Sequence, residues 1–378
     1  MQFSKEQFVL KKKLIADKKL FYTVTLLCLF GMVMLYSASN YSAIRDGLSE
    51  FYYVYKQAIA FIIGFFIMIF IGKADIEKLK KYKWFFLIIS YILLAMVFLP
   101  VIGVENYGAK RWINLGLFTI QPSEFAKFFL VIFISSVLAK KNSDTWSAIF
   151  IILISGGLMC LLIMLEPNMS ITLCVMAVMF IMLIVGGISI KKLLILLLPV
   201  LIGIPLLILA EPYRIKRLLA FIDPWASPLG EGYQLIQSYY AIGVGGFFGL
   251  GLFNSRQKYL FLPFSESDFI FSVICEELGL LGAIIFMAAF ATIIYCGIKI
   301  AINAVSKFSC YLATGITSVI AVQTLINLCV VTGMIPPTGV PLPFISSGGS
   351  SLICFMAAVG VLQAISAQSH KQNFYHSM

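Results

Sequence analysis

Long apolar segments alternate with short polar connections along the whole chain. The apolar runs are about 18–25 residues long, and about 20 residues suffice to cross the hydrocarbon core of a bilayer as a helix. In lipid, a helix pairs its main-chain N–H and C=O groups within one segment. The pattern predicts ten membrane-spanning helices, near residues 20–39, 53–72, 84–103, 119–138, 147–165, 168–187, 193–210, 268–295, 309–332 and 350–367.

Composition supports this fold class. Hydrophobic residues make up 61% of the 378 positions, whereas soluble domains contain about 45–50%. We therefore expect an all-α polytopic membrane protein with one integral membrane domain over residues 1–378. It would have a tail at 1–19, a large outer loop at 211–267 between the seventh and eighth helices, and a second tail at 368–378.

The basic residues predict the orientation of the helices. Lys and Arg number 28 against 17 Asp and Glu, giving a net charge of +11. Cytoplasmic loops of membrane proteins are enriched in Lys and Arg, and most lysines fall on one side if both termini are cytoplasmic. The first apolar run is too long for a signal-peptide core, so we expect an uncleaved span. The lysines are scattered over short loops, which does not indicate nucleic-acid binding.

Every arginine falls on the other, outer side. The planar guanidinium suits bidentate contacts with phosphate, whereas lysine is a compact point charge. An outer arginine cluster therefore indicates an anionic lipid headgroup or a pyrophosphate. The alternative is a chance distribution with local salt bridges. The arginines are Arg45, Arg111, Arg214, Arg217 and Arg256.

Cysteine and histidine exclude several kinds of site. The eight cysteines lie in apolar segments without CxxC spacing, so neither disulfides nor a zinc site are expected. The two histidines, His370 and His376, lie in the C-terminal tail. Acid–base chemistry in the membrane would therefore fall to carboxylates, lysine or tyrosine. The glycine-rich run 243–251 matches no phosphate-binding motif, and we expect it to allow close packing.

Three of the four carboxylates in Leu262–Gly279 (LPFSESDFIFSVICEELG) fall within the predicted span that begins at residue 268: Asp268, Glu276 and Glu277. A charged side chain at a helix centre costs roughly 2.5–3.5 kcal/mol on insertion scales. Asp268 lies at the outer end, and Glu276 and Glu277 lie about two turns deeper. Because their surroundings differ, their proton affinities should differ. We expect Asp268 to act as a base toward an interfacial substrate, and Glu276 or Glu277 to pair with a buried cation such as Lys127.

A second group surrounds the fourth predicted helix. Lys110, Arg111 and Trp112 precede it, and Glu124 and Lys127 lie three residues apart within it. Residues at this spacing share a helix face and can form an ion pair. The pair is either part of a functional site or purely structural.

Two further outer segments combine polar groups with flexible backbone. The segment from Tyr213 to Lys258 includes Arg214 and Arg217 and indicates a partly amphipathic re-entrant or interfacial segment; an anionic-lipid anchor is the alternative. The prolines and serines of Pro336–Ser351 precede the last helix. Helix N-termini bind anions, although helix capping alone would also explain this segment.

Five motifs in order resemble the SEDS proteins, the FtsW, RodA and SpoVE group of peptidoglycan glycosyltransferases. The motifs span nearly the whole chain. They are GAKRWINLGLFTIQPSEFAK, Phe221–Pro224, GYQLIQSYYAIGVGG, LPFSESDFIFSVICEELG and PLPFISSGGSS. The segment FYYVYKQ at 51–57 is more similar to the division and sporulation branch, FtsW and SpoVE, than to the elongation branch.

The resemblance implies polymerisation of lipid II at the outer face of the bacterial cytoplasmic membrane. An acceptor sugar 4-hydroxyl would attack the donor anomeric carbon with inversion, releasing undecaprenyl pyrophosphate. Expected partners are undecaprenyl-linked glycan, a class B penicillin-binding protein as transpeptidase, and further division, elongation or sporulation proteins. A divalent cation, Mg²⁺ or Mn²⁺, would suit the pyrophosphate, but no spacing of ligands indicates one.

The resemblance also implies roles for individual residues. Asp268 matches the family's essential aspartate and would be the general base. Glu276 and Glu277 would be structural partners of cations. The substrate-binding residues would be Lys110, Arg111, Arg214 and Arg217 for the pyrophosphate, Trp112 for sugar or lipid, and Glu124, Lys127, Ser346 and Ser350 as lining.

Three positions depart from the family pattern. Phe264–Ser267 replaces Glu-x-His-Thr, Ser347 replaces a tyrosine, and Glu166-Pro167-Asn168 replaces Gln-Pro-Asp, which moves the acid two positions earlier. Two other functions stay open: a flippase or transporter for lipid-linked precursors, which buried charges would also suit, and a non-catalytic scaffold for a transpeptidase.

Overall fold

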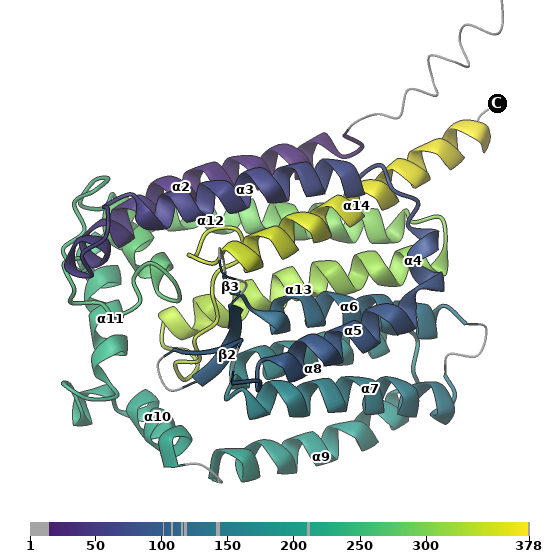
Figure 1. The fold of residues 1–378 in the computed structure, drawn as a ribbon, viewed down its shortest axis with the longest axis horizontal. Helices are drawn as coiled ribbons and strands as arrows, with labels where there is room; N and C mark the ends of the chain where they lie inside the picture. Colours follow the sequence, from purple (N-terminus) through teal and green to yellow (C-terminus); the bar gives the residue numbers. More distant parts are fainter. Residues whose placement is uncertain are drawn as a thin grey trace, which may run out of the picture.

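The computed structural model describes residues 15–100, 102–106, 109–114, 116, 119–140, 144–209 and 212–376. Residues 1–14 of the expected tail and Gly108 of the first motif lie outside this part. The long helices run side by side along one direction, and shorter helices lie at an angle at the ends of this bundle (Figure 1). They are α2 (Lys18–Arg45), α3 (Tyr52–Ile71), α4 (Glu77–Lys81), α5 (Lys83–Met96), α6 (Pro122–Leu138), α7 (Trp146–Leu165), α8 (Met169–Val185), α9 (Ile190–Leu209), α10 (Pro212–Ile222), the 3₁₀ helix η1 (Pro224–Ala226), α11 (Tyr233–Gly245), α12 (Ile270–Ile302), α13 (Lys307–Val331) and α14 (Gly349–His376).

The predicted membrane-spanning character is evident in the long helices. Each of the ten predicted ranges overlaps a helix. Within the described part of the chain, six helices are long and apolar enough to cross a membrane: α2, α3, α7, α12, α13 and α14. Helices α5 and α8 are apolar but shorter. The protein is therefore a multi-pass membrane protein.

The prediction of an all-α fold was wrong in one region. Gly103–Asn106 (β1), Ala109–Asn114 (β2) and Thr119–Ile120 (β3) form a small antiparallel sheet in the order β1-β2-β3. The predicted span 84–103 is too long for the same reason, because α5 ends at Met96 and Gly103 already begins β1. In this sheet the main-chain N–H and C=O groups are paired between neighbouring antiparallel strands rather than within a helix.

The two ends of the helix bundle differ. The sheet, α10 and α11 lie at one end, and the C-terminal end of α14 lies at the other (Figure 1). That second end also carries the connections α3–α5, α6–α7, α8–α9 and α12–α13. Two contacts join these connections: Lys192 pairs with Asp144 at 2.9 Å, and Ser306 donates a hydrogen bond to Glu77. The lysine-rich loops of the sequence thus gather at one end.

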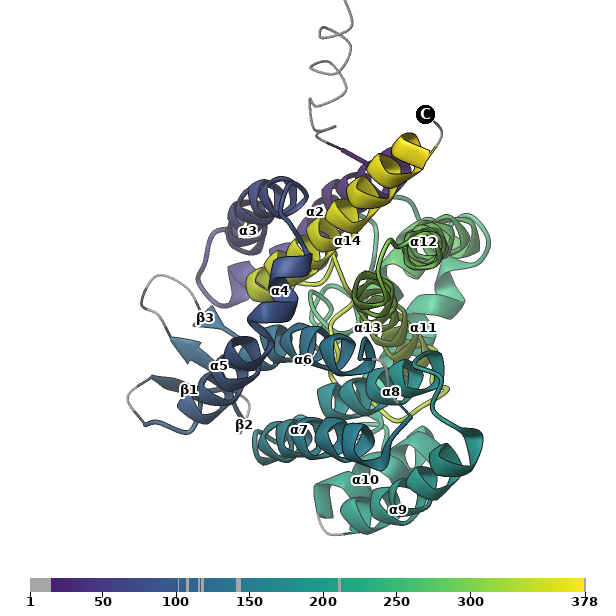
Figure 2. The same cartoon turned by 90° about the vertical axis from the view of Figure 1, so that its right-hand side faces the viewer.

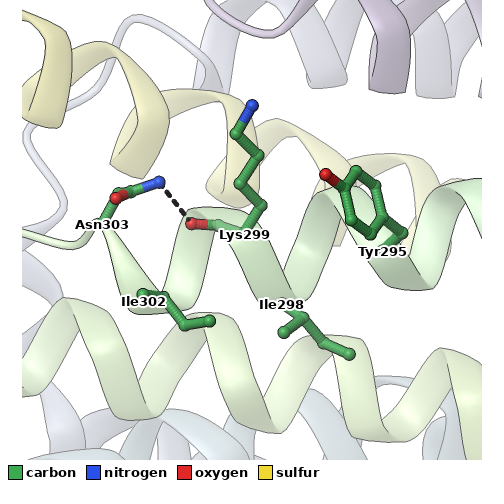
Figure 3. Close-up of a pocket in the computed structure, with 5 residues that line it drawn as sticks. All are labelled: Tyr295, Ile298, Lys299, Ile302 and Asn303. Atoms are coloured by element: carbon green, nitrogen blue, oxygen red, sulfur yellow. Dashed lines mark hydrogen bonds between the residues drawn. The ribbon is translucent and has the colours of Figure 1, made fainter.

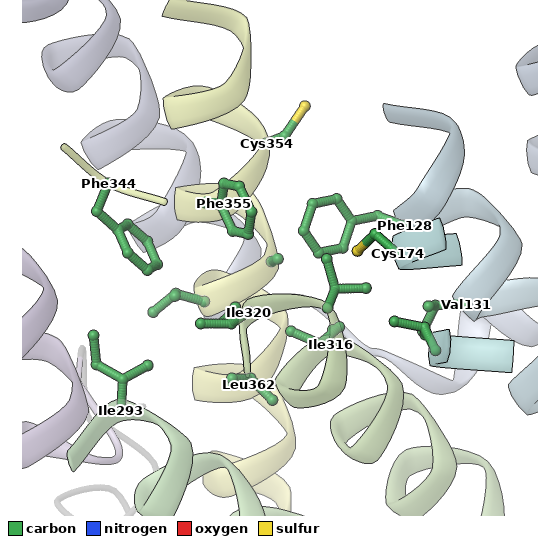
Figure 4. Packing of buried hydrophobic residues seen from close by; sticks show 14 of the residues in the cluster. Phe128, Val131, Cys174, Ile293, Ile316, Ile320, Phe344, Cys354, Phe355 and Leu362 are labelled. Atoms are coloured by element: carbon green, nitrogen blue, oxygen red, sulfur yellow. The ribbon is translucent and has the colours of Figure 1, made fainter. Parts of the chain in front are cut away.

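The core lies where α3 and α6 pack along α14 and where α13 contacts α6, α8 and α12 (Figure 2). Phe355 of α14 is fully buried between Phe128 of α6 and Phe344 (Figure 4). The centroid of its ring lies 5.4 Å from that of each partner, at interplanar angles of 89° and 55°. Tilted and edge-to-face pairs of this kind add about 0.5–1.5 kcal/mol beyond area burial. This aromatic cluster fixes α14 relative to α6.

The glycine-rich run packs closely, as predicted, and the structure shows that it does so against a break in α12. Gly279 has a φ of +65°, and this break removes helical partners from the carbonyl groups before it. Leu250 N–H donates to Glu276 O and Gly251 N–H donates to Glu277 O, both at 2.9 Å. A Cβ on Gly249 would lie 2.2 Å from Glu277 O, so only glycine allows this approach.

Candidate active site around Asp268

Asp268 lies in the turn that precedes α12, and its side chain is half-buried. Asn327 of α13 donates from Nδ2 to Asp268 O at 2.8 Å and to Val340 O at 2.7 Å. The amide therefore joins the segment before α12 to the segment before α14. The sequence placed Asp268 as the first residue of a helix, whereas α12 begins at Ile270.

The loop before α14 packs directly on Asp268. Gly339 has a φ of +72°, and a Cβ there would lie 3.1 Å from Asp268 Oδ2. Ser346 Oγ donates to Ser267 O at 2.5 Å, and Ser347 N–H donates to Glu266 O at 2.9 Å. These bonds hold the loop against the residues that flank the aspartate.

Charges from two other segments and from its own turn act on Asp268. Burial raises the pKa of its carboxyl to about 6; Arg111 and Arg217 lower that pKa, and Glu266 raises it. Arg111 lies in β2 and Arg217 in α10. The fold therefore brings two of the predicted outer arginines to the predicted base. A carboxyl with this pKa is mostly ionised at neutral pH and can accept a proton.

Arg111 is held by the turn between α7 and α8. Its Nε donates to Glu166 O at 3.2 Å, and its Nη2 donates to Pro167 O at 2.5 Å. Carbonyl groups at a helix C-terminus favour a cation. Arg217 makes a longer contact, from Nη1 to Pro337 O at 3.3 Å, which connects α10 to the loop beside Asp268.

The remaining predicted cations and Trp112 lie on the same outer elements. Lys110 is exposed on β2 opposite Glu105 of β1. Trp112 is half-buried on β2 opposite Val104. Arg214 is half-buried in α10, on the same helix as Arg217.

Glu124 and Lys127 form the predicted ion pair. Lys127 Nζ lies 2.8 Å from Glu124 Oε2, and the two side chains are 2% and 0% exposed. Lys127 also donates to Gln323 Oε1 at 2.5 Å, and Ser351 Oγ donates to Glu124 Oε2 at 2.7 Å. The pair thus connects α6 with α13 and α14. Glu124 Oε1 is buried without a hydrogen-bond partner.

The two predicted serines make structural contacts. Ser346 Oγ accepts a hydrogen bond from Leu342 N–H at 2.8 Å as well as donating to Ser267 O. Ser350 Oγ accepts from Gln121 N–H at 3.3 Å, just before α6. Ser346 therefore orders the loop beside Asp268, and Ser350 joins the start of α14 to the residue before α6. A role of either hydroxyl in binding substrate stays a prediction.

Glu277 pairs with a buried cation, as predicted, but the suggestion that this cation is Lys127 was wrong. Glu277 Oε1 lies 3.6 Å from Lys258 Nζ, and both side chains are almost fully buried. Glu277 also accepts from Ser37 Oγ at 2.5 Å. Glu276 accepts from Ser255 Oγ at 2.5 Å and from a main-chain N–H at 2.8 Å. Lys127 is already paired within its own helix, and the glycine run brings Lys258 to the break in α12.

Sequence reasoning missed three residues that shape the site. Asn327 and Gln323 lie one turn apart on α13 and donate to Val340 O and Pro341 O. Two amide side chains within an otherwise apolar predicted span could have indicated such contacts. Glu166 was noticed as a departure from the family pattern, but its position beside Arg111 was not foreseen.

Other features of the surface lie away from this site. A shallow pocket at the C-terminal end of α12 is lined by Tyr295, Ile298, Lys299, Ile302 and Asn303 (Figure 3). Asn303 Nδ2 donates to Lys299 O at 2.9 Å there. The pocket is at the opposite end of α12 from Asp268, so it does not contribute to the site.

The described residues offer no protein-only metal site. Groups of three or more His, Cys, Asp or Glu side chains that could hold an ion are absent from the part of the chain that the structure describes. Mg²⁺ commonly binds through one or two carboxylates together with substrate phosphates and water.

Comparisons with known proteins agree with this architecture. The model of the FtsW, RodA and SpoVE family, described as cell cycle proteins, matches residues 17–371. Stage V sporulation protein E of Bacillus subtilis is 38% identical over 361 residues, covering 95% of this chain and 99% of that protein. A protein of Geobacter sp. named probable peptidoglycan glycosyltransferase FtsW is 37% identical over 352 residues, covering 92% and 96%.

A solved structure shows the same fold. Its report is called "Structural coordination of polymerization and crosslinking by a peptidoglycan synthase complex". The superposition has a TM-score of 0.76 at 26% identity and covers 94% of this chain and 98% of the other. With a family match over nearly its whole length, this chain belongs to the FtsW, RodA and SpoVE family of cell cycle proteins.

Proposed function

We propose that this protein is a peptidoglycan glycosyltransferase that polymerises lipid II at the outer face of the cytoplasmic membrane. The observation that carries the proposal is the position of Asp268, a half-buried carboxyl on which Arg111 and Arg217 act from two other segments. Relatives covering most of the chain are named probable peptidoglycan glycosyltransferases, which supports this reaction class.

In the proposed reaction, the ionised Asp268 accepts the proton of the acceptor sugar 4-hydroxyl as that oxygen attacks the donor anomeric carbon. The new C–O bond forms on one face while the bond to pyrophosphate breaks on the other, which inverts the configuration. The leaving undecaprenyl pyrophosphate takes the bonding electron pair. Arg111 and Arg217 would offset its negative charge, with Lys110 and Arg214 nearby.

The proposed topology has ten spans with both termini in the cytoplasm. The gathering of the lysine-rich connections at one end of the bundle supports it (Figure 1), since cytoplasmic loops are enriched in lysine. The opposite end then faces outward with the sheet, α10, α11 and Asp268. Residues 211–267 form the large outer loop in this arrangement.

We further propose a class B penicillin-binding protein as partner. The similar solved structure belongs to a complex that coordinates polymerization and crosslinking, which supports a transpeptidase partner for this chain. A role in division or sporulation is favoured by the 38% identity with stage V sporulation protein E. A divalent cation would enter with the pyrophosphate of the substrate, and no step of the proposed reaction depends on it.

Reconstitution of the full chain with lipid II and its cognate transpeptidase tests the function. We expect glycan strands, detected as a ladder on a gel after the transpeptidase is blocked with a β-lactam. Movement of labelled lipid II across vesicles without polymer would instead identify a flippase. Absence of both polymer and lipid II movement, while the partner still binds, would identify a scaffold. Either of these two results would refute the polymerase assignment.

A further inference from the structure

Glu166 is a buried carboxyl that the proposed reaction does not use. It ends α7, its side chain is 0% exposed, and neither Oε1 nor Oε2 has a hydrogen-bond partner. Burial raises its pKa to about 8, although Arg111 lowers that pKa. Buried polar groups without a partner are rare and call for an explanation.

The turn that carries Glu166 also fixes Arg111. The guanidinium donates to the carbonyl oxygens of Glu166 and Pro167, at 3.2 and 2.5 Å. Two bonds from one planar group set its orientation as well as its position. The Glu166 carboxyl is therefore on the same short turn that directs the Arg111 charge.

The same turn reaches Asp268 by a second route. Asn168 caps α8 by accepting from Ile171 N–H at 3.3 Å. In the first turn of α8, Ser170 Oγ donates to Thr338 O. Thr338 precedes Gly339, whose backbone lies beside the Asp268 carboxylate. The α7–α8 turn thus contacts both the arginine that acts on Asp268 and the loop that packs on it.

We propose that Glu166 is a positioning residue for Arg111, and that through Arg111 it sets the positive charge offered to Asp268 and to a phosphate group bound there. The inference rests on the proposed function. Its physical basis is competition: a protonated Glu166 leaves the Arg111 charge available to other anions, whereas an ionised Glu166 offsets it.

The charged groups around the two carboxyls give the sign of the effect. Arg111 from β2 acts on Glu166. Arg111, Arg217 from α10 and Glu266 act on Asp268. As pH rises through about 8, Glu166 ionises and Arg111 binds an anionic leaving group less well. Polymerisation should therefore fall on the alkaline side, while Asp268 is fully ionised there.

The first test compares polymerisation of lipid II at pH 9 with that at pH 7, using the full chain with its transpeptidase. At one pH unit above its pKa about a tenth of Glu166 is protonated, so the wild-type rate should drop about tenfold. Glu166→Gln keeps the shape without the titration and should show a several-fold smaller drop. Glu105→Gln, the same change at an exposed glutamate of β1, should behave as wild type.

Two results would overturn the inference. One is an equal alkaline drop in Glu166→Gln and wild type. The other is a folded Glu166→Gln protein that is inactive at both pH values, because the carboxyl itself would then take part in the reaction.

A second measurement needs no turnover. Infrared difference spectra of the full chain should show the C=O band of a protonated carboxyl disappearing as pH rises through about 8. The band should be missing in Glu166→Gln, and its midpoint should move to higher pH in Arg111→Gln. A midpoint unchanged in Arg111→Gln would refute the coupling. Absence of polymer from wild type would refute the proposed function, while this infrared result would still decide the link between the two residues.

Discussion

The buried pair of Glu124 and Lys127 allows a quantitative prediction about stability. Both side chains are inaccessible to solvent, and each has one further polar partner, Ser351 for the carboxylate and Gln323 for the ammonium. The Lys127 ammonium also lies 4.6 Å from the ring centroid of Phe355. Substituting one member leaves the other charge buried and uncompensated.

Lys127→Met should lower the free energy of unfolding by about 3–5 kcal/mol, as for other broken buried pairs. Glu124→Gln should cost a similar amount. The double variant Glu124→Gln/Lys127→Met removes both charges and should cost less than the sum of the single variants by about 1–3 kcal/mol. Lys192→Met is the matched control, because the Lys192–Asp144 pair is partly exposed and should contribute at most about 1 kcal/mol.

The assay is equilibrium unfolding of the purified protein by SDS in bicelles, followed by tryptophan fluorescence. Additive losses in the double variant would refute direct coupling between the two charges. A loss in Lys127→Met no larger than that in Lys192→Met would refute the claim that burial makes this pair important for stability.

Three further predictions concern the site and its supports. Polymerisation should fall as pH drops below about 6, because Asp268 must be ionised to accept a proton. Arg217→Gln removes a cation and should move the midpoint of this acidic limb to higher pH; an unmoved midpoint would show that the Arg217 charge does not act on Asp268. Gly339→Ala places a methyl group 3.1 Å from Asp268 Oδ2 at a φ of +72° and should reduce kcat at least tenfold by displacing the carboxylate, an order-of-magnitude expectation for a small shift in geometry. Lys258→Met leaves Glu277 without its cation and should speed amide hydrogen exchange in residues 250–258, whereas exchange unchanged from wild type would show that this ion pair does not hold the loop.

The pattern of the sequence predicts the helices well because apolar runs of membrane length have few alternative structures in lipid. It predicts the pairing of Glu124 and Lys127 because a spacing of three residues places both side chains on the same face of one helix. The sheet at 103–120 escapes prediction, since its strands are short and contain glycine and asparagine. The strands form by pairing with one another across turns, and no repeating pattern of apolar and polar residues in the sequence reveals that pairing.

Contacts across the outer loops were predicted less well. The partner of Glu277 depends on how the glycine run folds back against the break at Gly279, so Lys258 could not be distinguished from other cations by spacing. The meeting of Arg111, Arg217 and Asp268 depends on the sheet, α10 and the turn before α12 together. Their residue types indicated phosphate chemistry, while their proximity is a property of the tertiary fold.

The most direct test of the central claim is the rate of lipid II polymerisation by Asp268→Asn in complex with the transpeptidase. Loss of a general base should lower the rate by about 10²–10⁴-fold while the protein stays folded and keeps its partner. Asp75→Asn, the same change at an exposed residue near the opposite end of the bundle, should polymerise as wild type. Polymerisation by Asp268→Asn at the wild-type rate would contradict the assignment of Asp268 as the base.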